Sequence, residues 1–448
     1  MNNILKILLI FSLISGCSFN KNSKFWTVEK LTEKNKINIT NIFAEEDPLN
    51  LEINPSLKIN LQSKVVNKNF SNNRDNNDGR INFDATFKNK SKFKFSKIDN
   101  FFRFEPEIIT HNNNIIFFDN KGAILKFDNN SNLLWKKNFY KKNEKKLKPI
   151  LQFANNNNIL IVADNISKYY ALDLDTGELL WSKYNNSPFN SQIKIYENNF
   201  FIVDSENTLK SYSLKNGNEI WKTKTSKAFI KSQKKLSIVI IDKKIYFNNS
   251  VGDISAVEIS TGNLLWQTPT QNSLILENTF SLKTADIVAS ADFLLVSNNK
   301  NNFFSLDAQT GAINWQQKVN THLRSTIIND LIFSITMNGF LTIIDSKNGN
   351  LIRATDTFSY VKKKKSRKNL LTGKIIEDKK RETIQPVGFI VGLKNIYLTT
   401  NKGRMLIIDI KTGKTKSIIK IDNNKISRPF VMNKNLFLAT DNSIIKLN

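Results

Sequence analysis

The stretch that decides the fold is ALDLDTGELLW, residues Ala171–Trp181, because closely similar phrases recur further along the chain. AVEISTGNLLW occupies Ala256–Trp266 and SLDAQTGAINW occupies Ser305–Trp315, with the same internal spacing. Three copies in one register indicate a structural unit that is repeated and stacked, so repeats have to be considered before any other reading of the fold.

Alignment on the glycine of this phrase extends the repeat to seven copies. The earliest copy, LKFDNNSNLLW, carries Ser131 in the glycine position and ends at Trp135. Successive positions lie roughly 40 to 50 residues apart, which is the size of a propeller blade, and the last interval is longer because it contains an insertion. The glycines are Gly177, Gly217, Gly262, Gly311, Gly349 and Gly413.

Each repeat contains four short apolar runs separated by turn residues. In the copy around Ala171–Trp181, the pattern predicts strands at Pro149–Phe153, Ile159–Val162, Lys168–Leu174 and Glu178–Lys183. The same alternation of short strands and turns runs from about residue 91 to the end of the sequence. Four antiparallel strands per repeat are typical of a β-propeller blade, and the chain is therefore predicted to be all-β.

An eighth unit is predicted from both ends of the sequence. Three strands, Phe430–Met432, Leu436–Thr440 and Ser443–Leu447, follow the seventh copy without a fourth. An open sheet edge invites aggregation, and the alternating segment Lys92–Ile98 is suited to fill it. We therefore expect residues 92–448 to form an eight-bladed β-propeller of four-stranded antiparallel blades, closed by the N- and C-terminal strands.

The recurring residues of the phrase suit mechanical roles. Glycine adopts the positive φ that ends such a hairpin loop, and a carboxylate four residues earlier can accept turn N–H groups. A large ring four residues after the glycine is suited to wedge between blades, although Arg353 and Ser417 replace it in two copies. The tryptophans are Trp135, Trp181, Trp221, Trp266 and Trp315, and the acids are Asp173, Glu258, Asp307, Asp345 and Asp409.

The N-terminus predicts export. Lys6 precedes an apolar run, Ile7–Ile14, that is too short to span a bilayer and is followed by small residues and Cys17. The ending ISGC resembles the bacterial lipoprotein box, which implies a signal peptide at residues 1–16 and acylation of Cys17; a plain signal peptide with an incidental cysteine is the alternative. Residues 17–91 are predicted to be a mostly disordered tether with occasional docking points.

Composition limits the chemistry that the chain can perform. Cys17 is the single cysteine, and His111 and His322 are the only histidines, so neither a disulfide nor a histidine-based metal site or catalytic triad can be built. The 448 residues include 66 Lys and Arg against 39 Asp and Glu, for a net charge of +27. A charge of this sign implies attraction to anionic surfaces, whereas export argues against nucleic acid as a partner.

A basic insertion is predicted at about residues 358–384. It contains VKKKKSRK at Val361–Lys368 and EDKKRE at Glu377–Glu382. Such a segment is usually a solvated loop, and the alternative is a site for anionic lipid or lipopolysaccharide phosphates. Salt-sensitive vesicle binding that depends on Lys362–Lys365 would favour the second reading.

The phrase A-x-D-x-x-T-G-x-x-x-W over residues 92–448 resembles the repeat of the pyrroloquinoline-quinone (PQQ) propellers. That superfamily includes quinoprotein dehydrogenases and the non-enzymatic BamB-like lipoproteins of the outer-membrane β-barrel assembly machinery. Likeness to the latter implies a scaffold without cofactor, anchored by lipid in the outer membrane and facing the periplasm. It also implies binding to the POTRA domains of the central barrel-inserting subunit, help for nascent outer-membrane proteins, and one copy within a hetero-complex.

The resemblance also implies which loops contact the partner. In BamB-like proteins the contact surface lies on loops after the third and fourth blade tryptophans, which correspond here to Thr225–Gln233 and Leu282–Val288. Within them, Phe229, Ile230, Lys231 and Asp286 are the predicted partner-binding residues, since apolar side chains beside a charge suit a small interface. The alternative is that Phe229 and Ile230 begin an inner strand.

A PQQ-dependent dehydrogenase is the competing function. Those enzymes resemble the chain in blade motif, but they need a calcium site and a catalytic aspartate and often carry an adjacent cysteine pair. The sequence has no second cysteine and no acidic cluster outside the turn positions. We therefore expect no enzymatic activity, no metal and no cofactor.

Overall fold

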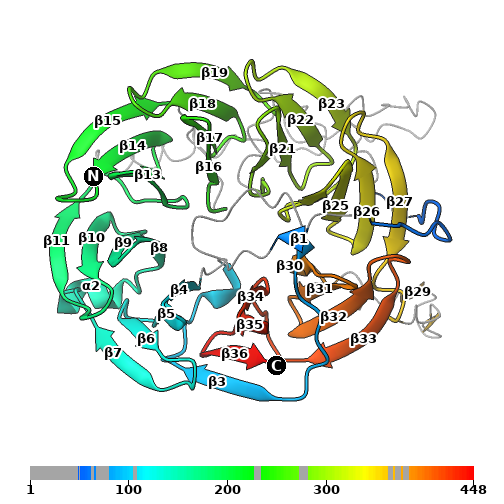
Figure 1. Cartoon of the computed structure of the whole chain (residues 1–448), viewed down its shortest axis with the longest axis horizontal. Coiled ribbons are helices and arrows are strands. Elements are labelled where there is room, and N and C mark those ends of the chain that lie inside the picture. The colour runs from blue at the N-terminus through cyan, green and yellow to red at the C-terminus, as the bar shows by residue number, and fades with distance from the viewer. Residues whose placement is uncertain are drawn as a thin grey trace, which may run out of the picture. The chain divides into compact units, whose positions relative to one another are not determined.

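The computed structural model arranges eight four-stranded sheets in a ring (Figure 1). It describes residues 49, 51–61, 65–66, 80–103, 108–226, 234–271, 281–361, 367–368, 375–376 and 383–448. The prediction of an all-β, eight-bladed propeller is confirmed.

Every blade is antiparallel, and seven of the eight use strands that are consecutive in the chain. The first four blades comprise β4 (Ile109–His111), β5 (Asn114–Phe118), β6 (Ile124–Phe127) and β7 (Leu133–Lys137); β8 (Leu151–Asn156), β9 (Ile159–Asp164), β10 (Lys168–Asp173) and β11 (Leu179–Tyr184); β12 (Lys194–Tyr196), β13 (Asn199–Val203), β14 (Thr208–Ser213) and β15 (Glu219–Lys224); and β16 (Ile238–Ile241), β17 (Lys244–Asn248), β18 (Ile254–Glu258) and β19 (Leu264–Thr268). The other four comprise β20 (Val288–Ala289), β21 (Phe293–Ser297), β22 (Phe303–Asp307) and β23 (Ile313–Gln317); β24 (Thr326–Ile328), β25 (Leu331–Ile335), β26 (Phe340–Asp345) and β27 (Leu351–Asp356); β30 (Pro386–Val391), β31 (Asn395–Thr400), β32 (Arg404–Asp409) and β33 (Thr415–Lys420); and β34 (Phe430–Met432), β35 (Asn435–Ala439), β36 (Ser443–Leu447) and β3 (Lys90–Lys94).

Stacking of blades explains the hydrophobic pattern of each repeat. The two middle strands of a blade contact the neighbouring blades on both faces, so β9 (ILIVAD) and β10 (KYYALD) are buried almost throughout. The outer strand β11 (LLWSKY) alternates between exposed and half-buried positions. Near-continuous apolar runs therefore mark the middle strands, and the mixed run marks the rim of the ring.

The ring closes through pairing of the two ends of the propeller. Strand β3 pairs antiparallel with β36, from Lys90 opposite Leu447 to Lys94 opposite Ser443. Phe93 is fully buried and lies 5.8 Å from the Phe127 ring of the first blade, measured between ring centroids. The closing strand begins two residues earlier than the predicted Lys92 and ends at Lys94, after which Ile98 still donates its N–H to the Asp441 carbonyl at 2.7 Å.

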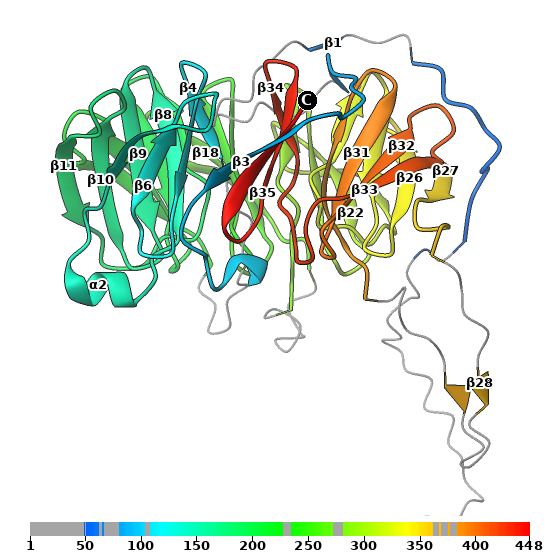
Figure 2. The ribbon, with the colours of Figure 1, turned by 90° about the horizontal axis from the view of Figure 1, so that it is seen from below.

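The two faces of the ring carry different connections. Hairpins between third and fourth strands lie on one face, which we call the turn face. Connections from one blade to the next lie on the opposite face, which we call the connection face; the short helix α2 (Lys142–Lys146) belongs to it, as Figure 2 shows. Loops of the connection face lead directly into the innermost strands, so they approach the central channel.

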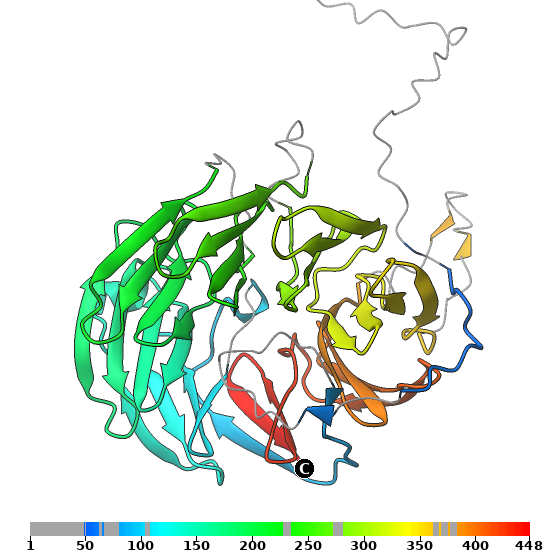
Figure 3. The same ribbon diagram turned by 45° about the horizontal axis from the view of Figure 1, so that its top comes forward.

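Parts of the predicted tether contact the propeller. Ile53 forms an antiparallel bridge with Ala354 of β27, and Ile59 is buried beside the sixth and seventh blades. Further along, Phe83 packs with Tyr397 at a ring-centroid distance of 5.1 Å. The two-residue strands β1 (Val65–Val66) and β2 (Arg80–Ile81) pair in parallel, and β2 contacts the inner strands β24 and β30. Figure 3 shows the blue N-terminal segment running along the outside of the ring beside the yellow sixth blade.

The remaining predictions for the N-terminal segment and the insertion are not addressed by the structure. The signal peptide and the lipidated Cys17 lie outside the described residues, as do Lys362–Lys365. Within the insertion, β28 (Arg367–Lys368) and β29 (Ile375–Ile376) form a short antiparallel pair. Among the described residues, no helix has the length and apolarity needed to cross a membrane.

Candidate functional site

Each tryptophan of the repeat locks its blade to the next one. The Trp181 indole of the second blade donates its Nε1–H to the Leu214 carbonyl of the third blade at 3.0 Å. Its ring lies against Gly217, where an added Cβ would sit 2.6 Å from Cζ3 of the indole. Trp135, Trp221, Trp266 and Trp315 repeat the same bond, to the carbonyls of Leu174, Ile259, Ala308 and Ser346 respectively. The predicted wedge is therefore observed at five blade junctions, and its role is structural.

The turn that receives the indole is held by its own side chains. Asp173 accepts the N–H groups of Asp175 and Thr176 at 2.9 and 2.8 Å, and the N–H of Thr176 is the main reason that the pKa of Asp173 is lowered. The aligned glycines all have positive φ, between 67° and 78°. The Asp173 carboxylate therefore stabilises the turn that receives the indole.

The first blade uses a shorter version of this turn. The Asp128 N–H donates to the Asn132 carbonyl and closes a loop of five residues. In the second blade the Asp173 N–H donates to the Glu178 carbonyl, so that loop is one residue longer. Ser131 takes the glycine position with φ of 73°. A non-glycine residue in the left-handed region is uncommon and strained, and here it coincides with the one copy in which the loop is shortened.

The sixth blade replaces the indole with a guanidinium group and a second segment of chain. Arg353 is fully buried, and its Nη1 donates to the carbonyl of Lys411 in the turn of the seventh blade and to the carbonyl of Leu57 at 2.9 Å. Ile59 adds its N–H to the same Lys411 carbonyl at 3.0 Å. We call residues 51–61 the strap, because they cross this junction on the outside of the ring.

Ser417, the other departure from tryptophan, has a simpler cause. It is an exposed residue on β33 of the seventh blade, whose neighbour is the eighth blade. In that blade the third strand β36 and the fourth strand β3 come from opposite ends of the propeller, so no hairpin joins them. An indole at position 417 would have no glycine turn to enter.

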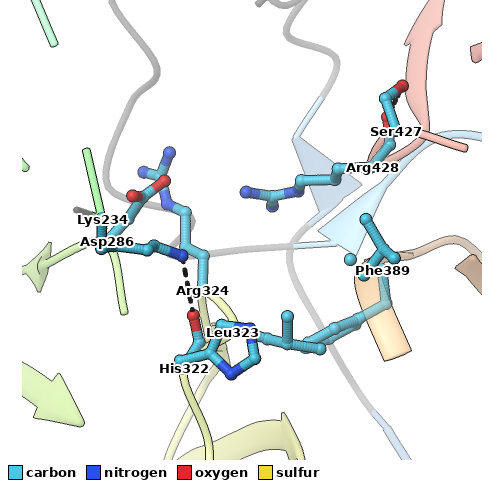
Figure 4. A pocket seen from close by; sticks show the side chains of 10 residues that line it. Lys234, Asp286, His322, Leu323, Arg324, Phe389, Ser427 and Arg428 are labelled. Carbon is cyan, nitrogen blue, oxygen red and sulfur yellow. Dashed lines mark hydrogen bonds between the residues drawn. The ribbon is translucent and has the colours of Figure 1, made fainter. Parts of the chain in front are cut away.

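A charged pocket lies where the innermost strands of five blades begin. It has a volume of about 20 Å³, and four connections between blades and the inner strand β30 contribute to it. The Lys234 ammonium group donates a hydrogen bond to the His322 carbonyl, with an Nζ–O distance of 3.3 Å. Figure 4 shows Arg428 extending toward the side of the pocket that carries Arg324 and Asp286. Three cations against one carboxylate make the local charge positive.

The predicted partner-binding residues fall at this end of the channel or outside the described chain. Asp286 lines the pocket and is 9% exposed. It is therefore recessed below the surface of the connection face and does not stand at an exposed loop tip. Phe229, Ile230 and Lys231 lie outside the described residues. The first described residue after them, Lys234, lines the pocket together with Asp286.

The pocket does not fit the quinone cofactor of the related dehydrogenases. A volume of about 20 Å³ holds about one water molecule, far less than a tricyclic quinone requires. Calcium takes six to eight oxygen ligands, and the described lining provides one carboxylate, Asp286. Among the described residues, no three His, Cys, Asp or Glu side chains form a group that could hold a metal ion. We therefore derive no step that uses quinone chemistry.

The fold and the repeated contact between a tryptophan and the turn of the next blade define a β-propeller of the PQQ-repeat class. The family model described as outer membrane protein assembly factor BamB matches residues 120–355, so the chain belongs to this BamB-like propeller family. No curated protein sequence matches the chain.

Solved structures show the same fold at low sequence identity. BamB from Moraxella catarrhalis is 12% identical with a TM-score of 0.61, over 81% of this chain and 99% of that one. A europium-containing methanol dehydrogenase is 12% identical with a TM-score of 0.56, over 84% and 87% of the two chains. A quinohemoprotein alcohol dehydrogenase from Comamonas testosteroni is 10% identical with a TM-score of 0.53, over 81% and 76%. At these identities the matches show the fold alone.

Sequence reasoning missed the pocket cations. Arg324 and Arg428 stand two residues before the first residues of the innermost strands β24 and β34, at positions without a repeated motif. Their signal is positional. Asp286 also lies two residues before its innermost strand, β20, whereas Lys234 lies four residues before β16. An alignment of these positions across the repeats would have placed Asp286, Arg324 and Arg428 together.

Proposed function

We propose that this chain is a non-enzymatic scaffold of the outer-membrane β-barrel assembly machinery, anchored in the outer membrane through Cys17 and facing the periplasm. It binds the POTRA domains of the central subunit through the connection face and aids insertion of barrel proteins. The observation that carries the proposal is membership of the BamB-like family over residues 120–355. The closed ring supports it, because a rigid ring can present loops without needing a catalytic centre.

The connection face is the proposed contact surface for two reasons. The predicted contact residue Asp286 lies there, and the pocket that it lines also contains Lys234, Arg324 and Arg428. Charged groups around a recess favour a partner of complementary charge and speed association more than they add affinity. A POTRA domain that presents a side chain of complementary charge at this point would be attracted to the recess.

The test is binding of purified POTRA domains to the full chain, measured by calorimetry. Asp286→Arg and the double substitution Phe229→Ala with Ile230→Ala are expected to weaken binding at least about tenfold, as the loss of an interface hot spot does. Glu178→Arg, at an exposed residue of a hairpin on the turn face, is the matched charge-reversal control and should bind normally. Absence of POTRA binding by the native chain would overturn the proposal.

Binding of anionic lipid or lipopolysaccharide is the second candidate function. The three pocket cations and the net charge of +27 favour it. It predicts co-sedimentation with anionic vesicles that weakens steeply with salt and disappears when Lys362–Lys365 are replaced by glutamine. Equal binding to neutral vesicles would exclude this function.

A further inference from the structure

Two short helical segments lie next to each other on the connection face. One is α2, in the connection between the first and second blades, and the other is η1 (Phe101–Arg103), which precedes the first blade. Figure 2 shows α2 and the cyan ribbon of η1 at the same end of the ring. The Lys148 ammonium group after α2 contacts the Asp99 carboxylate before η1, with an Nζ–Oδ2 distance of 2.5 Å. The two segments therefore form one continuous surface.

Each segment presents one large apolar side chain to solvent. Phe102 is 61% exposed and Leu147 is 62% exposed. Among the large apolar side chains of the described residues, only Leu51 is more exposed. Phe102 follows Asp99 by three residues and Leu147 directly precedes Lys148, so the two apolar side chains flank the ion pair that joins the segments. Neighbouring apolar side chains with a charged surround are typical of an interaction surface.

Both segments are held against the ring from beneath. Phe101, directly before the exposed phenylalanine, is 3% exposed and belongs to the hydrophobic core of the first blade. In α2, Glu144 accepts a hydrogen bond from the Tyr184 hydroxyl of β11 at 2.5 Å. Tyr140, which precedes α2, donates its hydroxyl to the buried Asp164 carboxylate at 2.5 Å. The outward position of the two apolar side chains is therefore fixed by the fold.

Basic side chains surround the two apolar ones. Arg103 lies over the Phe102 ring, with its Cζ 5.2 Å from the ring centroid. Two acids, Glu105 and Glu107, follow η1 in the sequence and lie outside the described residues. Even with both of them included, bases outnumber acids, so this surface is positive. In residues 97–103 and 141–148 the bases are Lys97, Arg103, Lys141, Lys142, Lys145, Lys146 and Lys148, and the acids are Asp99 and Glu144.

We propose that residues 97–103 and 141–148, which we call the membrane patch, seat the ring on an anionic bilayer surface, with Phe102 and Leu147 entering the headgroup region. Contacts of this kind gain free energy from buried apolar area and from attraction between bases and anionic lipids. Lysine dominates the patch and meets mobile phosphates as a flexible point charge, whereas protein interfaces favour arginine, tyrosine and tryptophan. The inference rests on the proposed function, in which Cys17 anchors the chain to a membrane.

The membrane patch leaves another sector of the connection face open. It lies in the connections that lead into the first and second blades. The pocket residues Lys234, Asp286 and Arg324 come from the connections before the fourth, fifth and sixth blades. A ring seated through the patch can therefore still present these residues to a protein partner.

The test places the environment-sensitive fluorophore nitrobenzoxadiazole on a cysteine introduced into the full chain, as Phe102→Cys or Leu147→Cys. Leu180→Cys, at a 51% exposed residue of the outer strand β11, is the matched control. The unsubstituted chain, labelled in parallel, gives the contribution of Cys17. Because all variants share one N-terminus, anchoring is common to them, and the fluorophore reports which surface enters the bilayer.

The vesicles consist of phosphatidylcholine alone or of equal parts of phosphatidylcholine and phosphatidylglycerol. With the anionic vesicles, emission at positions 102 and 147 should brighten and shift to the blue, while position 180 stays as in water. A water-like signal at 102 or 147, or an equal response at 180, would overturn the proposal. An equal response in pure phosphatidylcholine would overturn the assignment to anionic lipid.

Charge reversal in α2 tests the electrostatic part. Lys142→Glu with Lys146→Glu, at two exposed residues, should lower the ratio of inserted to free fluorophore at position 102 at least about tenfold, because each base near an anionic surface adds attraction. Lys215→Glu with Lys414→Glu makes the same change in net charge on turn-face hairpins and is the matched control. Equal loss in the two pairs, or no loss in the first, would refute the membrane patch.

A third comparison separates the membrane patch from the basic insertion. Replacement of Lys362–Lys365 by glutamine should leave the response at positions 102 and 147 unchanged, and loss of the response there would assign the membrane contact to the insertion. None of these measurements contains POTRA domains. Their failure therefore leaves the scaffold proposal standing, and loss of POTRA binding leaves the membrane patch standing.

Discussion

The junction between the second and third blades and the junction between the sixth and seventh blades solve one geometric problem with different residues. In the first, a single indole from Trp181 fills the gap, stacks on Phe200 at a centroid distance of 6.1 Å and donates to the Leu214 carbonyl. In the second, Arg353 supplies the donor, and Ile59 of the strap supplies apolar volume. The comparison teaches that the turn of the next blade is the constant part, and that its filling can come from distant sequence.

The second solution is the more demanding one. Burial lowers the pKa of the Arg353 guanidinium, and Asp409 nearby opposes that shift. In the described structure its Nε and Nη2 atoms have no hydrogen-bond partner. A buried charge with incomplete pairing costs free energy. The Leu57 carbonyl of the strap lowers this cost because it accepts a hydrogen bond from Arg353, so the strap contributes a polar contact as well as an apolar one.

The largest effect is expected from removing the indole of the second blade. Trp181→Ala leaves a gap between two blades and should lower the free energy of unfolding by about 3 kcal/mol. Equilibrium unfolding in urea, followed by circular dichroism, measures the change. Leu180→Ala, at the exposed neighbouring position, is the control and should change stability little. Equal losses in the two variants would show that the indole does not lock the junction.

The glycine that receives the indole gives the next largest effect. Gly217→Ala places a methyl group at a φ of 67° and 2.6 Å from the Trp181 ring. Left-handed backbone costs a non-glycine residue about 1–2 kcal/mol, and the clash adds to it, so a loss of about 2–3 kcal/mol is expected. Gly252→Ala, where the nearest atom is a leucine methyl at 3.0 Å, is the milder comparison. The same unfolding assay compares them, and a Gly252 loss equal to that of Gly217 would argue against the clash.

Placing a tryptophan at the junction between the sixth and seventh blades should release the strap. In Arg353→Trp the indole is expected to occupy the space that the strap now fills. The rate of tryptic cleavage after the exposed Lys58 should then rise more than about tenfold, because cleavage requires local opening. Ile59→Asp, which removes the buried anchor, should give the same cleavage while the ring keeps its global stability. Resistance of Lys58 in both variants would show that the strap is held by other contacts.

The smallest effect concerns pH. The pKa of Asp173 is lowered from 3.8, chiefly because the N–H of Thr176 donates to its carboxylate. A carboxyl group whose pKa is lowered by folding stabilises the folded protein at pH values above its unfolded-state pKa. This stabilisation is lost as the pH falls through the folded-state pKa. Asp173→Asn should therefore lower Tm slightly at about pH 6, and the difference should shrink below about pH 3.8. A difference that grows on acidification would contradict the sign.

The fold was predictable from the sequence because each blade repeats local chemistry. The spacing of Gly177, Gly217 and Gly262 and the indoles that follow them specifies four-stranded units, and the unpaired strand at Ser443–Leu447 requires a partner from the other end. These features depend on short-range patterns, which a sequence displays directly.

The strap and the pocket depend on contacts between distant residues. The sequence predicts a tether at the strap, although apolar Ile53, Leu57 and Ile59 lie there at odd-numbered positions. The strand that the strap pairs with lies about 300 residues away. No local feature of the sequence identifies which blade's outer edge the strap pairs with. The pocket joins residues from five blades, none of which belongs to a repeated motif. Arg353 was the available clue, since a charge in a tryptophan position requires a compensating partner.

Amide hydrogen exchange at the outer strands tests the central claim most directly, because it compares an occupied blade edge with an open one in the same molecule. We predict that the N–H groups of Ala354 and Asp356 exchange slowly, that Ser182 exchanges quickly, and that Ile59→Asp makes positions 354 and 356 as fast as 182. Equal exchange of all three in the native chain, or slow exchange at 354 after the strap is released, would contradict it.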